Sequence, residues 1–135
     1  VALLDFQDAL AGHPAYDLVS LLQDARRDVD PTLARGLVTK FSAAIGAEAA
    51  EFGRAYAILG VQRNLRILGF FARLSAHFGK PRYIDLIPRV WQHLVDSLTH
   101  PDMAELRRAV LDQFPPPDPA FLNTLRSKCP TPQKR

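Results

Sequence analysis

The sequence contains little of what disulfide-linked, zinc-binding or membrane-spanning proteins need. Among its 135 residues Cys129 is the single cysteine, which excludes an internal disulfide framework and leaves no cluster of Cys and His residues with the spacing of a zinc site. A single thiol is typical of a reducing compartment, so we expect a cytoplasmic protein. No run of 18 apolar residues occurs, which argues against a membrane-spanning helix and against a membrane partner.

Charge of one sign is not concentrated anywhere in the sequence. Seventeen Lys and Arg residues against fourteen Asp and Glu residues give a net charge of +3, and the basic residues are spread along the chain. The densest basic group, Lys128 with Lys134 and Arg135, lies at the C-terminal end. A nucleic-acid interface would require a basic patch or stripe, so we expect no nucleic-acid partner. The apolar content of 47% is that of an ordinary globular domain.

The first residues predict a strand, a loop and the start of a helix. Four apolar residues, 1–4, run directly into Asp5, and Gly12 and Pro14 follow shortly. Asp5 would then lie at the exit of a buried strand, with Asp8 close by. Carboxylate oxygens are the ligands that Mg²⁺ prefers, so this pair is a candidate metal site. The alternative is that Asp5 only ends a strand and that Asp8 is a solvated acid in a turn.

The rest of the chain is helical by pattern. Apolar residues at helical spacing, with Pro and Gly residues between the runs, predict helices over about 14–27, 31–45, 48–77, 81–98 and 102–114, with either a kink or a restart at Pro88. We expect Arg26 and Arg27 to close the first helix and Trp91 to be buried with a partner for its indole N–H. The predicted fold is mainly α, with about five helices preceded by one short β-strand.

Two parts are expected along the chain. Residues 1–114 would comprise the strand (1–5), a metal loop (5–13) and the helices (14–114), and residues 115–135 would form a Pro-rich tail with a short docked segment around 121–125. A lone apolar strand needs pairing partners that this helical chain does not offer. We therefore expect the sequence to be the C-terminal portion of a larger protein.

The longest predicted helix carries an arginine on its apolar stripe. The large residues of this stripe are Phe52, Tyr56, Leu59, Ile67, Phe70, Leu74 and Phe78, and position 63 on the same stripe is Arg. A buried charge needs a partner, so Arg63 and its neighbour Asn64 are candidate substrate-binding residues. The alternative is that the stem of Arg63 packs while its guanidinium reaches water.

Three strings of the sequence resemble a known kinase superfamily. They are Leu-Asp-Phe-Gln-Asp-Ala at residues 4–9, followed after six residues by Tyr-Asp-Leu-Val-Ser-Leu-Leu-Gln-Asp at 16–24; Gln-Arg-Asn-Leu-Arg-Ile-Leu-Gly at 62–69; and Leu-Ile-Pro-Arg-Val-Trp at 86–91. The superfamily is that of the aminoglycoside phosphotransferases and choline kinases. Within it, the sequence resembles bacterial kinases that phosphorylate N-acetylmuramate and N-acetylglucosamine at the anomeric carbon. The resemblance covers roughly residues 1–100 and is most specific in the first string.

The resemblance implies a fold, two substrates and several residue roles. The chain would be part of the helical C-lobe of a protein-kinase-like fold, and the whole protein would transfer phosphate from ATP to an amino sugar with Mg²⁺. Asp5 would ligate the magnesium on the nucleotide phosphates, with Gln7 and Asp8 as further candidates for metal-loop or substrate contacts. Asp17 would brace the catalytic loop. Without the resemblance, Asp17 would be interpreted as an acidic residue that the helix dipole favours in the first turn of a helix.

Other parts of a kinase site are missing from the sequence. The only His-x-Asp string is His100-Pro101-Asp102, and Arg107 stands where the second magnesium ligand would be. No Gly-rich phosphate loop or strand lysine is present either. We therefore expect the catalytic base upstream of Val1 and no kinase activity from residues 1–135 alone.

Several alternatives remain open at this point. The acceptor could be an aminoglycoside or another small alcohol, although five arginines in the third and fourth helices (Arg63, Arg66, Arg73, Arg82 and Arg89) favour a neutral or anionic acceptor over a polycation. The chain could instead be a non-catalytic helical interaction module, which would need no magnesium. A nucleic-acid binder is a third alternative.

Overall fold

The computed structural model describes residues 11–130, which form helices and contain no strand. The α-helices are α1 (Ala15–Leu22), α2 (Pro31–Ala44), α3 (Ala49–Phe78), α4 (Ile87–Ser97), α5 (Ala104–Gln113) and α6 (Pro119–Ser127), and two short 3-10 helices, η1 (Pro81–Leu86) and η2 (Pro101–Met103), precede α4 and α5. The predicted mainly α fold is confirmed. The strand predicted over residues 1–5 lies outside the described residues, as do Asp5, Gln7 and Asp8 of the predicted metal loop.

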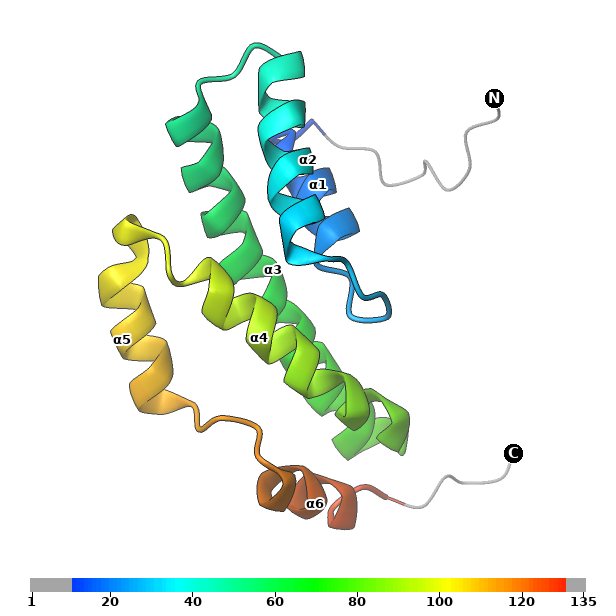
Figure 1. Cartoon of the computed structure of the whole chain (residues 1–135). Coiled ribbons are helices and arrows are strands. Elements are labelled where there is room, and N and C mark those ends of the chain that lie inside the picture. The colour runs from blue at the N-terminus through cyan, green and yellow to red at the C-terminus, as the bar shows by residue number, and fades with distance from the viewer. Residues whose placement is uncertain (1–10, 131–135) are drawn as a thin grey trace, which may run out of the picture.

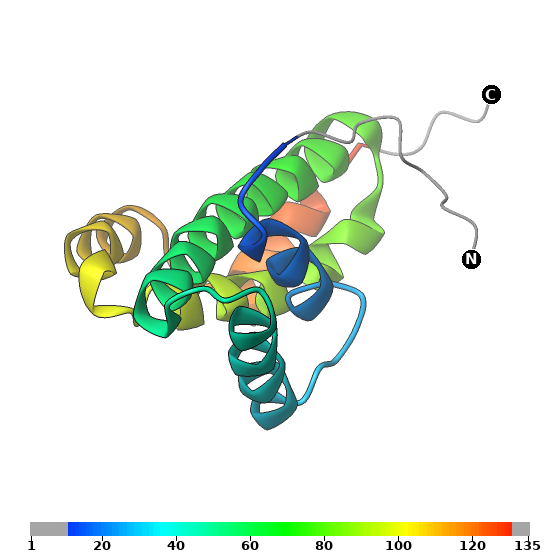
Figure 2. The same cartoon turned by 90° about the horizontal axis from the view of Figure 1, so that it is seen from above.

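Helix α3 is the element on which the others are assembled. It is 30 residues long and contacts α1, α2, α4, η1 and α6. In Figure 1 it runs diagonally through the molecule, with α1 and α2 beside its N-terminal half and α4 alongside it. Figure 2, seen from above, shows α2 and α5 at the periphery. One long helix therefore sets the positions of both α1 and α4.

Side-chain caps and glycines fix the ends of α2 and α3 where the sequence predicted them. Asp30 Oδ1 accepts hydrogen bonds from the backbone N–H groups of Thr32 and Leu33, both at 2.9 Å, which satisfies donors that have no partner within the helix. Glu48 caps α3 in the same way. The hydrogen bonds that its carboxylate accepts from backbone N–H groups lower the pKa of Glu48. Gly79 ends α3 in the left-handed conformation, with φ of 59°, where a residue without Cβ is favoured.

Of the two outcomes predicted for the fourth helical segment, the restart is confirmed. The chain runs through η1, and α4 begins at Ile87 with Pro88 in its first turn. A proline in that turn removes an N–H that would have no helical partner, so it begins a helix instead of breaking one.

Two predictions about α1 and α3 are wrong. Helix α1 ends at Leu22, so Arg26 and Arg27 lie beyond its last turn. Phe70 and Phe78 are 55% and 56% exposed, whereas Phe71 is buried. Phe52 and Leu74 of the predicted stripe are buried, but the buried side of α3 also includes small residues, because neighbouring helices approach closely there, and it leaves Phe70 and Phe78 outside.

The core consists of three connected clusters along α3. The first joins α1 to Phe52; the second joins Val61 to the end of α4 and to α5; the third joins Phe71 to η1, α4 and Leu122 of α6. Trp91, which was expected to be buried, is half-buried at the edge of the second cluster, and its indole N–H has no hydrogen-bond partner among residues 11–130. The clusters hold α1 and α4 against opposite stretches of one helix.

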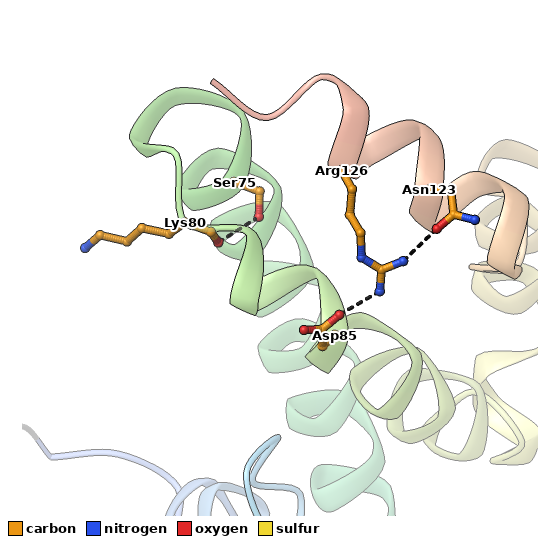
Figure 3. Close-up of polar contacts among 5 residues, drawn as sticks. All are labelled: Ser75, Lys80, Asp85, Asn123 and Arg126. Atoms are coloured by element: carbon orange, nitrogen blue, oxygen red, sulfur yellow. Dashed lines mark hydrogen bonds and ion pairs between the residues drawn. The ribbon is translucent and has the colours of Figure 1, made fainter. Parts of the chain in front are cut away.

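Helix α6 docks against η1 at the far end of α3. Figure 3 shows Arg126 reaching from α6 to Asp85 at 2.6 Å, while its other terminal nitrogen donates to Asn123 at 2.9 Å. Both partners of this ion pair are largely exposed, so it contributes at most about 1 kcal/mol. Burial of Leu122 and a contact of 3.0 Å from Cys129 Sγ to the carbonyl of Ser75 complete the docking.

Burial of His93 on α4 predicts a pH dependence of stability. Burial lowers the pKa of His93 below its ordinary value of 6.5, against the opposing effect of Asp96. The unfolded chain therefore binds this proton more readily, and the free energy of unfolding should fall as the pH drops below about 6.5. Chemical denaturation at a series of pH values should show the decline, and His93→Gln should make it shallower. An unchanged decline in the variant would contradict this assignment.

Candidate functional site

A buried polar network joins α1, α3 and α4 at the centre of the molecule. Asn64 Nδ2 donates to Gln23 Oε1 at 2.7 Å and to the carbonyl of Gly60 at 2.8 Å. Gln23 Nε2 in turn donates to Ser97 Oγ at 3.3 Å, and the Ser97 hydroxyl donates to the carbonyl of His93 at 2.8 Å. Gln23 directly follows α1, so the network fixes the end of α1 against α3 and α4.

The network depends on a close approach at Gly60. A Cβ atom there would lie 2.5 Å from Ser97 Oγ and 3.3 Å from Gln23 Nε2. Only glycine leaves room for the α3–α4 contact at this point, because any side chain would overlap the serine. Sequence reasoning missed Gly60 and Gln23, since neither belongs to an apolar stripe.

Asn64 lies in this network and not at the surface. It is 0% exposed, and its Oδ1 atom has no hydrogen-bond partner among the described residues. Its bond to Gln23 gives it a structural task in positioning α1. The role of Asn64 in substrate binding is an untested prediction, and the burial favours an indirect effect through α1.

Asp17 lies in the first turn of α1, where its carboxylate is exposed. It makes no ion pair with any residue between 11 and 130. His13 fixes the start of this helix: its Nδ1 accepts from the backbone N–H of Ala15 at 3.1 Å, and its ring packs 5.8 Å from that of Phe52. The carboxylate of Asp17 is thus held on a fixed helix and is not neutralised within the described part of the chain.

A hollow of about 570 Å³ lies beside Asp17, between α1 and α2. Its lining is mostly apolar and comprises Pro14, Asp17, Leu18, Leu21, Leu37, Lys40, Phe41 and Ala44. Leu21 is 55% exposed at this surface. The carboxylate of Asp17 therefore lies beside an apolar surface that contains one lysine, Lys40. Its role as a brace of the catalytic loop stays a prediction.

A second hollow, of about 290 Å³, contains Arg63. It lies between α1 and α3 and is lined by Tyr16, Arg63, Arg66, Ile67 and Phe70. The Nε atom of Arg63 is buried and has no hydrogen-bond partner in the described part of the chain. The structure thus brings Tyr16, the neighbour of Asp17, together with Arg63, while it places Asn64 elsewhere. Sequence reasoning missed Tyr16 and Phe70, because an aromatic residue at helical spacing is more often part of the core.

Three of the arginines named for the acceptor wall, Arg73, Arg82 and Arg89, have partners within the fold. Arg89 donates to the carbonyl of Ala25 at 2.9 Å and pairs with Asp28 at 2.6 Å, so it holds the α1–α2 loop against α4. The Cζ atom of Arg73 lies 5.8 Å from the ring centroid of Phe78. That of Arg82 lies 5.1 Å from the ring centroid of Tyr83. A hydrogen bond from Arg82 lowers the pKa of Tyr83. Arg89 in particular is used as a structural clamp.

The metal prediction rests on residues that the structure does not describe. Among residues 11–130 no three His, Cys, Asp or Glu side chains gather as a metal site would require. Asp5, Gln7 and Asp8 offer oxygen donors only, which suits a hard cation such as Mg²⁺. Within the same described range, none of the helices combines the length and apolar content that crossing a bilayer requires.

Comparisons with known proteins agree on one family. Residues 1–56 match the phosphotransferase enzyme family. Proteins named N-acetylmuramate/N-acetylglucosamine kinase are similar over longer stretches: that of Caulobacter vibrioides is 44% identical over 117 residues, which is 86% of this chain and 32% of that protein. That of Pseudomonas aeruginosa is 37% identical over 112 residues (77% and 33%), and that of Neisseria meningitidis serogroup B is 41% identical over 99 residues (68% and 30%).

The extent of these matches is also informative. The chain spans about a third of the length of the curated relatives it matches. The family match covers α1 and α2, and the similarity to the kinases extends across most of the helical assembly around α3. The chain is therefore similar to the phosphotransferase enzyme family over residues 1–56, and to the named kinases over most of its own length.

Proposed function

We propose that these residues form the C-terminal part of a kinase that transfers phosphate from ATP to the anomeric hydroxyl of N-acetylmuramate and N-acetylglucosamine. The observation that carries this proposal is the 44% identity to a kinase named for these two sugars, over 86% of the chain. The arginine hollow on α3 supports a neutral or anionic acceptor. The proposed setting is cell-wall recycling in the cytoplasm, which the single cysteine favours.

The proposed roles fall on residues between positions 5 and 17 of the sequence. Asp5 ligates Mg²⁺, with Gln7 and Asp8 beside it, and the metal neutralises charge on the transferring phosphate. Asp17, held by the first turn of α1, braces the catalytic loop. The catalytic base, the second metal ligand and the nucleotide-binding lobe come from outside residues 1–135, because the sequence carries no motif for them.

A coupled ATP assay tests this proposal. The intact mass of the purified protein should be determined by mass spectrometry, and the protein should be assayed with N-acetylmuramate, N-acetylglucosamine and kanamycin. We expect the polypeptide that contains these residues together with an upstream kinase lobe to phosphorylate the two amino sugars and not kanamycin. We expect residues 1–135 alone to be inactive. Turnover by the 135-residue chain, or turnover of kanamycin only, would refute the respective part of the proposal.

A further inference from the structure

The hollow between α1 and α3 has the composition of a binding site for a small organic anion. Two arginines, Arg63 and Arg66, line it together with Ile67 and two aromatic residues, Tyr16 and Phe70. Phe70 is 55% exposed and Tyr16 is 39% exposed, so both rings present apolar surface to solvent at this point. Its volume of about 290 Å³ suits a ligand with the size of a monosaccharide or a part of it.

The charge in this hollow is not balanced by the described residues. Arg63 and Arg66 are three positions apart on α3, so their side chains are neighbours on one face and repel each other. Neither pairs with a carboxylate anywhere in residues 11–130, and the Nε atom of Arg63 is buried without an acceptor. Four other arginines of the chain do pair with aspartates: Arg27, Arg54, Arg89 and Arg126.

We infer that the hollow between α1 and α3 binds the carboxylate of an acidic sugar acceptor, with Arg63 as its main partner and Arg66 as a supporting charge. The inference rests on the proposed function and deepens it. N-acetylmuramate carries a lactyl carboxylate that N-acetylglucosamine lacks, so this hollow would distinguish two acceptors that share the same ring. A guanidinium matches the geometry of a carboxylate, and the rings of Tyr16 and Phe70 offer apolar surface to a sugar face.

Calorimetric titration of the complete kinase polypeptide with each sugar tests the inference, and ATP is titrated in parallel. Arg63→Met keeps an apolar stem and removes the charge, and we expect it to weaken N-acetylmuramate binding by about tenfold or more, the usual scale for a charge-assisted hydrogen bond. Binding of N-acetylglucosamine and of ATP should change less than about twofold. Arg63→Lys should retain part of the preference for N-acetylmuramate, and Arg66→Met should weaken its binding less than Arg63→Met does.

A matched control lies on the same helix. Arg73 is exposed, lies over Phe78 and does not line the hollow, so Arg73→Met should leave binding of both sugars unchanged. Equal binding affinity of the unmodified protein for the two sugars would overturn the inference. So would an Arg63→Met variant that loses affinity for both sugars equally, or one that loses affinity for ATP. Turnover assays on the same samples test the proposed function separately. Selective binding without phosphorylation of either sugar would refute the kinase assignment but not the specificity of the hollow.

Discussion

Asp5→Ala in the proposed kinase is expected to lower the rate of amino-sugar phosphorylation by about a thousandfold, the upper end of what losing one preorganised charge-stabilising group costs. Asp5 is the proposed ligand of the magnesium on the nucleotide phosphates. Without it the metal would be held less firmly where charge develops on the transferring phosphate. Steady-state assays with N-acetylglucosamine at saturating ATP, repeated over a range of Mg²⁺ concentrations, measure the effect.

The control for this change is a carboxylate elsewhere on the surface. Asp112 on α5 is exposed and makes no ion pair within residues 11–130, so Asp112→Ala should leave the rate unchanged. Circular dichroism of both variants should match that of the unmodified protein. Full activity of a folded Asp5→Ala variant would instead favour the alternative of a non-catalytic helical module, which needs no magnesium.

The second large effect is expected at Gly60, where α3 and α4 are in closest contact. Gly60→Ala should lower the free energy of unfolding by about 1 kcal/mol, because the added Cβ overlaps Ser97 and overpacking a core costs roughly 1–3 kcal/mol, of which helix propensity offsets up to about 1 kcal/mol. At Gly69, on the same helix, an added Cβ would meet no heavy atom of a neighbouring element within 4 Å. Gly69→Ala should therefore raise the stability by up to about 1 kcal/mol through helix propensity alone. Urea denaturation of the two variants measures both changes.

A double-mutant cycle identifies the overlap as the cause. Ser97→Gly removes the two nearest atoms that a Cβ at position 60 would meet and leaves Gln23 Nε2 at 3.3 Å, so Gly60→Ala should be less destabilising in a Ser97→Gly background. Equal effects in both backgrounds would show that the loss arises elsewhere. Stabilisation by Gly60→Ala alone would show that α3 and α4 are not packed this closely.

The helix boundaries could be predicted from the sequence because local chemistry determines them. Asp30 and Glu48 cap their helices with their own side chains, and Gly79 supplies the left-handed residue after α3. Each of these signals acts within a few residues of the boundary that it sets. The end of α1 carries no such signal, and the prediction therefore ran on to Arg27.

The buried face of α3 could not be predicted in the same way. Which side of a helix is covered depends on neighbours distant in sequence, and here the neighbours approach through Gly60 and Ser97. Small and polar residues occupy the middle of that side between the larger Phe52 and Phe71, whereas Phe70 and Phe78 lie outside it. Close helix packing selects small residues at the contact, which a search for large apolar side chains overlooks.

For the site, the sequence named Arg63 and Asp17, and the structure adds their surroundings. Arg63 lines the same hollow as Tyr16 from α1, a proximity of residues 47 positions apart that no local pattern reveals. Asn64, adjacent in sequence, points into the core because neighbouring helix positions differ by about 100°. Adjacent residues in a motif thus have different tasks once the helix is placed.

The modest docking of α6 separates the molecule into regions that open independently. A largely exposed ion pair, the packing of Leu122 and Leu125 and the contact from Cys129 to Ser75 secure α6, whereas α1, α3 and α4 share extensive apolar burial and a polar network. Local opening follows the weakest contacts, so backbone amides of α6 should exchange with deuterium well before those in the middle of α3. The C-terminal helix can therefore detach and return while the packing that holds Asp17 and Arg63 in place persists.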